Sequence, residues 1–268
     1  MTSRIITGKR TAIDIIRAYH EKQARLGEQK DAPRDTNPLI QTDFSLEDKT
    51  DHYTMTGVLY QGSLCRVDLA KALLDNGASR TQDQWVQYSQ EVERNDAFRV
   101  GDFPLYHALF TTLYRNRDTP QYQEAIEQAR TFIDKQMKAK WLTTLTRIGY
   151  QPSGQDTIIH NYNMPNQSTL QADVTGPDGL VSTLQGETAL FKDLLGTEDM
   201  QEIQNVYHWL TNVPLYLWRV NAKPPQIDER VARFDADAGR TNLNCNRYPQ
   251  YSNATLGVRI FSIGNNRQ

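Results

Sequence analysis

The stretch from Arg233 to Arg259, RFDADAGRTNLNCNRYPQYSNATLGVR, interleaves two patterns of residues. In its middle, Asn242, Asn244 and Asn246 are separated by Leu243 and Cys245, which is the two-residue period of a strand with one buried and one outward face. The stretch therefore predicts an apolar scaffold with a polar outward face. The scaffold positions are Phe234, Ala236, Leu243, Cys245, Pro249, Leu256 and Val258.

The residues that precede this stretch predict a mixed domain from residue 139 onward. WLTTLTRIGY, after Lys140, alternates like a strand, and turn signals rich in Pro, Gly and Asn follow it. Apolar spacing predicts helices over 187–195, which Gly196 ends, and over 198–210, which Thr197 caps. We expect short strands in LYLWRV, ERVARF, TNLNCN and LGVRIFSI, with Trp218 in the core beside them.

Helical patterns dominate residues 1–138. Periodic apolar residues predict helices over 10–26, 67–74, 81–92, 103–113 and 120–137, with one short β-like run over 54–65. The second of these predictions depends on Val67, Ala70, Leu73 and Leu74, which would share one helical face. The chain is also long enough for two domains of about 150 residues. We therefore expect an α+β protein with a mostly helical N-terminal module (1–138) and a separate C-terminal domain (139–268).

Composition argues against several classes of function. The net charge of −2 gives no global attraction to nucleic acid, and the basic residues near the N-terminus are soon interleaved with acids. The longest apolar runs are much shorter than the roughly 20 residues of a membrane span, and the N-terminus lacks the apolar core of a signal peptide. Two cysteines make no disulfide framework, and the five histidines have no metal-ligand spacing. We expect no metal ligand and no cofactor.

The second half resembles the C-type lectin fold, in the version shared by formylglycine-generating enzymes and by the variable proteins of diversity-generating retroelements. The motifs that carry the resemblance are IIHNYNMPNQ, VTGPDGLV, LLGTED, YLWRVNAKP, and ERVARFDAD followed by CNRYPQYSNATLGVR. They are most similar to the archaeal and archaeal-virus group of variable proteins. The resemblance extends only loosely to residues 1–138.

The resemblance implies a non-enzymatic protein that displays changeable residues on a rigid scaffold and binds a variable ligand, a protein or other surface macromolecule, on a virion or host-cell surface. Retroelement mutagenesis rewrites adenines, and Asn codons can then yield residues of almost every chemical type. Tyr and Arg supply contact energy in such sites, while Asn, Ser and Gly adapt. The implied ligand-binding positions are Asp235, Asp237, Gly239, Arg240, Asn242, Asn244, Asn246, Tyr248, Tyr251 and Asn253.

Three other interpretations stay open at the level of sequence. The stretch could consist of ordinary surface loops, since Asn, Asp, Gly and Ser dominate turns for backbone reasons. A formylglycine-generating-type enzyme needs reactive cysteines, whereas the second half has only Cys245, on the face expected to be buried. A calcium-dependent sugar lectin needs acidic and amide motifs from which Gln151-Pro152-Ser153 and Met164-Pro165-Asn166 depart.

Overall fold

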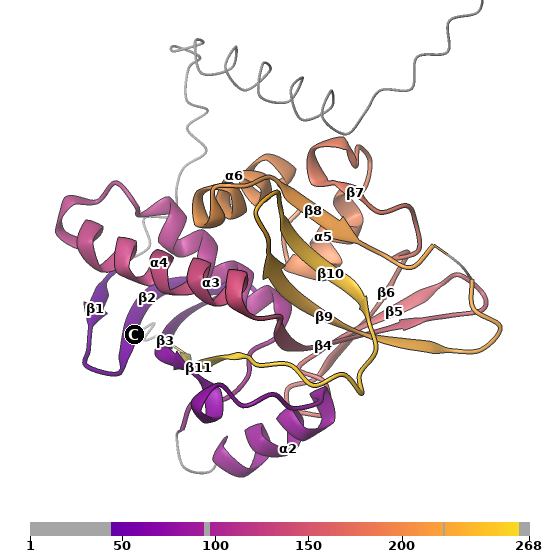
Figure 1. Ribbon diagram of the computed structural model, residues 1–268, viewed down its shortest axis with the longest axis horizontal. Helices are drawn as coiled ribbons and strands as arrows, with labels where there is room; N and C mark the ends of the chain where they lie inside the picture. Colours follow the sequence, from indigo (N-terminus) through magenta and orange to yellow (C-terminus); the bar gives the residue numbers. More distant parts are fainter. Residues whose placement is uncertain (1–43, 94–96, 222, 263–268) are drawn as a thin grey trace, which may run out of the picture. The chain divides into compact units, whose positions relative to one another are not determined.

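The computed structural model describes residues 44–93, 97–221 and 223–262, which belong to one compact unit spanning Thr42–Gln268. The helix expected over 10–26 lies outside the described residues. The chain is an α+β protein (Figure 1). Its helices are α2 (Gln82–Glu93), α3 (Phe103–Arg115), α4 (Gln123–Ala139), α5 (Thr188–Leu195) and α6 (Met200–Thr211), with short 3-10 turns η1 (Leu74–Gly77), η2 (Pro120–Tyr122) and η3 (Val181–Thr183).

Two sheets organise the described residues. The smaller has the order β1-β2-β3-β11 and is antiparallel; the larger has the order β6-β5-β4-β9-β10-β8-β7 and is antiparallel except where β8 runs parallel to β10. The strands are β1 (Leu46–Asp48), β2 (His52–Tyr60), β3 (Ser63–Leu73), β4 (Leu142–Tyr150), β5 (Asp156–His160), β6 (Ser168–Ala172), β7 (Gly179–Leu180), β8 (Leu215–Trp218), β9 (Asp228–Ala236), β10 (Thr241–Arg247) and β11 (Leu256–Ser262).

An aromatic cluster joins the large sheet to the helices. Phe234 of β9 is buried, and its ring centroid lies 4.2 Å from that of Phe103 and 5.7 Å from that of Phe110, both on α3. Tyr207 of α6 stacks on the other side of the cluster, 6.0 Å from Phe234. Helix α3 also contacts β2 of the small sheet. Helix α3 therefore packs against both sheets.

Residues on both sides of position 139 share this core, so the boundary expected there does not separate two packing units. Strand β11 pairs with β3, and the indole N–H of Trp85 donates to the carbonyl oxygen of Asn253 across 168 residues (2.8 Å). The buried apolar cluster runs from Leu46 to Val258. The described part of residues 1–138 is also not helical throughout, because three strands occupy 46–73.

The helix expected over 67–74 is wrong, because residues 63–73 form β3. Cys65, Val67 and Leu69 alternate on the buried face of this strand, and partners on both edges, β2 and β11, satisfy its backbone. Two-sided pairing of a β-branched, alternating segment outweighs a helical spacing of four apolar residues.

The other helices were predicted close to their observed positions. Thr81 and Gln84 form the expected reciprocal capping box at α2, with a backbone–side-chain hydrogen bond in each direction (2.9 and 3.3 Å). Gly196 ends α5 in the left-handed conformation that favours glycine (φ 83°). The N-cap of α6 is Asp199, whose carboxylate accepts from the Glu202 backbone N–H, and not Thr197.

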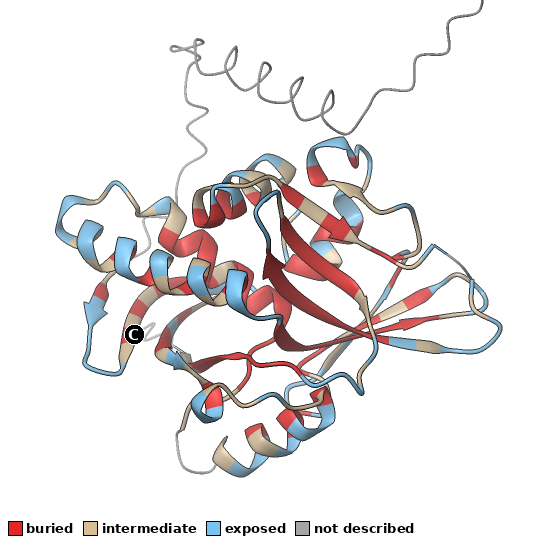
Figure 2. Cartoon of the chain, viewed as in Figure 1, coloured by how far each residue is buried: buried red, intermediate tan, exposed pale blue. Residues whose placement is uncertain are grey.

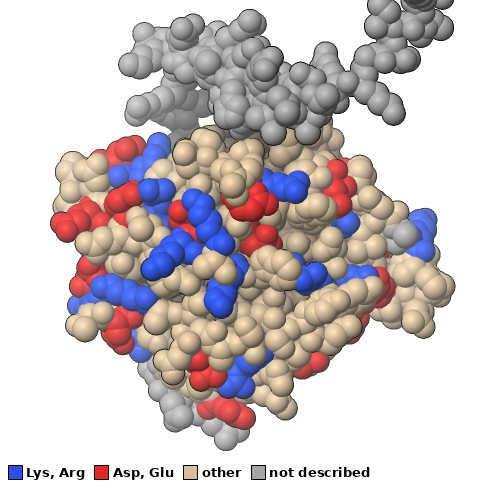
Figure 3. Space-filling model, in the orientation of Figure 1, with Lys and Arg blue, Asp and Glu red and all other residues tan. Residues whose placement is uncertain are grey.

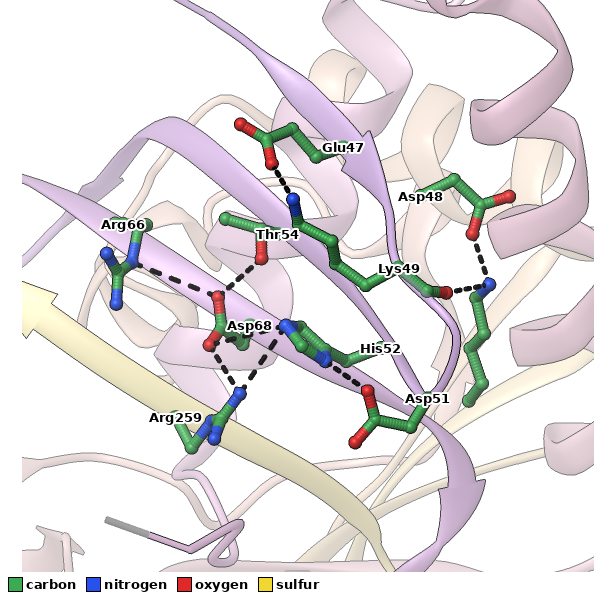
Figure 4. A network of polar contacts seen from close by, with 10 residues as sticks. Glu47, Asp48, Lys49, Asp51, His52, Thr54, Arg66, Asp68 and Arg259 are labelled. Atoms are coloured by element: carbon green, nitrogen blue, oxygen red, sulfur yellow. Dashed lines mark hydrogen bonds and ion pairs between the residues drawn. The ribbon is translucent and has the colours of Figure 1, made fainter.

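Charged side chains on the outer face of the small sheet are mutually paired (Figure 4). Asp68 of β3 is buried and accepts from the Thr54 hydroxyl (2.9 Å) and from Arg259 Nη2 (2.8 Å). Arg66 and His52 lie 3.9 and 3.8 Å from the same carboxylate. Within the described residues, no helix is long and apolar enough to cross a membrane.

Candidate ligand-binding face

The candidate site is the side of strands β8, β9 and β10 that faces away from the aromatic core. Pairing places Tyr216 opposite Asn242, and Asn242 opposite Asp235, in one row across the three strands. The next row is Trp218, Asn244 and Arg233. Leu243 and Cys245 point to the core and are fully buried. We call this side the ligand face; it also includes Trp141, Arg230, Arg240, Asn246, Arg247, Tyr248, Tyr251 and Asn253, which contact it from strand ends and loops.

Strands β9 and β10 are buried along most of their length although no helix covers the side toward the viewer (Figure 2). Side chains of the ligand face cover one another instead. Asn242 donates from Nδ2 to Asp235 Oδ2 (2.7 Å) and accepts from the indole N–H of Trp218 (2.9 Å). Asn242 and Asp235 are consequently only 5% and 8% exposed. Part of the implied variable set is therefore an internal hydrogen-bond chain.

Trp218 does not lie in the core, contrary to expectation. It is partly exposed on the ligand face, and the buried residue of this strand is its neighbour Leu217. The alternation of β8 explains the result: Leu215 and Leu217 point inward, and Tyr216 and Trp218 point outward with ring centroids 4.9 Å apart.

The side chains of Asn244 and Asn253 are tied to the scaffold as well, whereas Asn246 takes part only through its backbone N–H. The side-chain oxygen of Asn244 accepts from the Asn246 backbone N–H (3.3 Å), and Asn244 is nearly buried. Asn253 accepts from Arg233 Nη1 (3.3 Å), while its backbone forms a two-way bridge with Arg80. These amides fix the positions of their neighbours more than they offer free surface.

The hairpin between β9 and β10 is closed by Asp237. Its side chain accepts from the backbone N–H groups of Gly239 (2.8 Å) and Arg240 (3.0 Å), the local pattern that makes Asp a turn residue. Arg240 pairs with the same carboxylate (3.6 Å) and lies over the rings of Tyr216 and Trp218, 4.8 and 5.0 Å from their centroids. Asp237 and Gly239 thus shape the edge of the face.

Tyr248 and Tyr251 are the most accessible of the implied positions, at 43% and 47% exposure. The Tyr251 N–H donates to the Tyr248 carbonyl (3.2 Å) across a four-residue turn with Pro249 at its second position, where proline presets the backbone. Their ring centroids lie 6.0 Å apart in an edge-to-face arrangement, and Arg230 lies over the Tyr248 ring (3.6 Å). The turn therefore displays two aromatic rings with little conformational freedom.

Trp141, Arg233 and Arg247 also belong to the face, although none of them is among the ten positions that the resemblance implies. Trp141 precedes β4 and is 46% exposed; the guanidinium carbons of Arg233 and Arg247 lie 4.2 and 4.1 Å from its ring centroid. Arg233 precedes Asp235 by two residues, so strand alternation could have placed it on this face. Trp141 arrives only through the pairing of β4 with β9, which has no local signal.

Exposed aromatic surface concentrates on this face. Five large hydrophobic side chains are exposed in the described residues, and Trp141, Tyr248 and Tyr251 are three of them. The same face carries Arg230, Arg233, Arg240 and Arg247. In the view of Figure 3, Lys and Arg side chains gather left of the centre. Aromatic and Arg side chains are enriched in the energetically dominant centres of protein interfaces.

Burial perturbs two charged groups of the face. Desolvation, together with the nearby positive charge of Arg247, lowers the pKa of Arg233 to about 10, so the guanidinium stays charged at neutral pH. Desolvation raises the pKa of Asp235, although the hydrogen bond from Asn242 opposes this. Asp235 Oδ1 and Arg233 Nε are buried without a hydrogen-bond partner, which is costly in an isolated protein.

Cys245 has the properties of a core residue. It is fully buried, and desolvation raises the pKa of its thiol to about 12. A thiol of this kind is not a reactive nucleophile. Across residues 44–93, 97–221 and 223–262, no group of three or more His, Cys, Asp or Glu side chains is arranged to hold a metal ion.

A cavity adjoins the ligand face beside Trp141. Its volume is about 240 Å³, and Lys140, Trp141, Ser252, Asn253 and Ala254 form part of its wall. This is smaller than the roughly 300–1,000 Å³ typical of small-molecule sites, so it has room for only a small part of a larger ligand.

Comparison of the chain with protein-family models, curated proteins and solved structures gives no match, so the assignment of function depends on the ligand face itself.

Proposed function

We propose that this chain is a non-enzymatic binding protein of the receptor or adhesion type, which holds a protein or other surface macromolecule on its ligand face. The observation that carries the proposal is the coincidence of three exposed aromatic rings with arginines on a helix-free side of a sheet. Large exposed apolar groups rimmed by polar residues mark interaction surfaces.

The proposal includes a C-type-lectin-type scaffold diversified by a retroelement, on a virion or host-cell surface. Support comes from the motifs quoted for the resemblance and from the order of elements, in which α5 and α6 precede β8–β11. Further support is that buried Phe234, Leu243 and Cys245 alternate with residues of the ligand face along two paired strands. Such alternation lets one face change while the other maintains the core.

We propose that the ten implied positions differ in how freely their residues can be substituted. Asn246, Tyr248 and Tyr251 lie outside the internal hydrogen-bond chain and are the positions most open to change. Asp235 and Asn242 exchange a hydrogen bond, so they change as a pair or at a cost in stability. Asp237 and Gly239 are constrained by the hairpin turn.

The retroelement part of the proposal is tested by sequencing the DNA that flanks the gene. We expect a reverse-transcriptase gene and a near-copy of the codons for residues 233–259 that differs from them only at adenines. A flanking region without either of them contradicts diversification.

The scaffold part is tested by a substitution library displayed on yeast and sorted for protease resistance. One library randomises Asn246, Tyr248 and Tyr251, and the matched library randomises Phe234, Leu243 and Cys245. We expect most members of the first library and few of the second to remain folded, because only the second set is fully buried. Equal survival of both libraries refutes the division into scaffold and face.

A further inference from the structure

Arg247 is held in place by aromatic rings and has no ion-pair partner among the described residues. Its guanidinium carbon lies 4.1 Å from the ring centroid of Trp141 and 4.7 Å from that of Tyr251, so two exposed aromatic side chains fix its plane. Arg247 is partly exposed, and no carboxylate of the described residues lies within 4.0 Å of it. An aromatic support of this kind reduces the entropy that a flexible side chain loses on binding.

Arg233 adds a second positive charge close to Arg247, at the same Trp141 ring. Arg233 is 2% exposed, also contacts Trp141, and has one hydrogen bond, to the amide oxygen of Asn253. No described carboxylate lies within ion-pairing distance of Arg233 either, and its Nε is buried without a partner, as is Nε of Arg247. The two neighbouring guanidinium groups, one of them desolvated, repel each other, and the Asp235 carboxylate attracts both from beyond ion-pairing distance. Two positive charges thus share one nearby negative charge.

Several other arginines of the described residues pair with carboxylates. On the ligand face itself, Arg230 pairs with Asp228 and Arg240 pairs with Asp237. On the small sheet, Arg66 and Arg259 share Asp68 (Figure 4). The pair Arg233 and Arg247, which forms no ion pair with a described carboxylate, is therefore a local feature of one part of the ligand face.

We propose that the ligand is a protein that presents a carboxylate side chain to Arg247, next to a side chain that enters the cavity beside Trp141. This inference rests on the proposed function and names the chemistry that the ligand face recognises. A carboxylate satisfies guanidinium donors in a planar, two-point geometry. The cavity volume of about 240 Å³ suits one neighbouring side chain of the same partner.

A protein fits the face better than a polyphosphate. Asp228, Glu229, Asp235 and Asp237 lie on or beside the same strands and would repel a dense row of phosphates, whereas one carboxylate among apolar groups meets Arg247 alone. The exposed rings of Trp141, Tyr248 and Tyr251 also require apolar contact surface, which protein side chains supply.

The experiment uses the full chain as bait for a phage-displayed library of random linear peptides. We expect the recovered peptides to be richer in Asp and Glu than the starting library. Biolayer interferometry then measures the Kd of recovered peptides for the wild type and for Arg247→Gln, which we expect to weaken binding about 10- to 100-fold, the range for a hydrogen bond to a charged group.

Two further variants make the result specific. Arg66→Gln removes an arginine that also stacks on an aromatic ring, Phe261 at 3.8 Å, but is paired and lies on the other sheet; we expect less than about a twofold change in Kd. In the Arg247→Glu variant, replacing the peptide's acid by Lys restores binding if the two groups meet directly. Circular dichroism confirms that each variant is folded.

The outcomes separate the two levels of the proposal. In one outcome, the recovered peptides are not enriched in acids, and Arg247→Gln leaves their affinity unchanged while the Tyr248→Ala/Tyr251→Ala double variant lowers it. This outcome refutes recognition of a carboxylate but supports the ligand face as the binding site. A selection that yields no peptide sensitive to either change overturns the ligand face as well. A single-stranded DNA probe that binds more tightly than the acidic peptides, and does so through Arg247, overturns the choice of a protein.

Discussion

Phe234 provides the sharpest test of how the chain divides scaffold from binding surface, because its strand neighbours Arg233 and Asp235 belong to the ligand face. The Phe234 ring is 1% exposed and contacts the rings of Phe103, Tyr106, Phe110 and Tyr207. Replacing a buried Phe by Ala costs about 3–5 kcal/mol. Loss of four aromatic neighbours places Phe234→Ala toward the upper end, at about 4–5 kcal/mol.

The corresponding fall in melting temperature follows from the size of the unit that unfolds. Residues 42–268 form one compact unit, and a unit of this size loses about 2–4 °C per kcal/mol. We therefore expect Phe234→Ala to lower Tm by about 8–20 °C in differential scanning calorimetry. Urea denaturation should show a lower midpoint with an unchanged slope, since the surface exposed on unfolding stays the same.

Tyr248→Ala is the matched control for this variant. Tyr248 is also aromatic but 43% exposed, so we expect its removal to cost less than about 1 kcal/mol. Phe234→Leu keeps most of the buried volume and should cost less than about 1.5 kcal/mol. Equal shifts of Tm for Phe234→Ala and Tyr248→Ala would refute the assignment of the two sides of β9 and its neighbouring turn.

Three further variants test other parts of the structure. His107 is buried on α3, where desolvation lowers its pKa from 6.5 to about 3. The folded state therefore loses stability as pH falls below about 6.5, by about 2 kcal/mol between pH 6.5 and 5. A series of Tm measurements over this pH range should show that His107→Leu removes the pH dependence. Asp102 caps α3 and accepts from Tyr60 and Asn161 while fully buried, so Asp102→Ala should cost about 3–5 kcal/mol in urea denaturation, and a loss under 1 kcal/mol would contradict the network. Trp218→Phe removes one hydrogen bond to Asn242 and should lower the free energy of unfolding by only about 1 kcal/mol in the same assay. A loss of about 3 kcal/mol or more would indicate that Trp218 is a core residue.

The parts of the fold with strong local signals were predictable from the sequence. Helices α2 and α3 carry apolar stripes, and α2 has a capping box that the structure contains. The alternation around Leu243 and Cys245 also predicts which residues of the strand are buried, since the two-residue period is a local property. The signals of these segments lie in their own residues and can be recognised without knowing which partner lies beside them.

Segments whose structure depends on distant partners were not predictable in this way. Val67 and Leu69 fit a helical as well as an alternating pattern, and only the strands on either side of β3 decide between them. Trp218 and Trp141 show the same limit at the level of the site. Which side of β8 is covered depends on where α6 packs, and Trp141 reaches the ligand face because β4 pairs with β9.

The pairing of β11 with β3 has a consequence for the order of events during synthesis. A ribosome translates residues 233–259 before β11 is complete, so the small sheet cannot close until the whole ligand face has been made. Contacts so far apart along the chain slow folding. A substitution that spoils the β9–β10 hairpin would therefore leave β3 without its partner, exposed to chaperones and proteases. In this way the last described strand links survival of the nascent chain to the integrity of the sequence that precedes it.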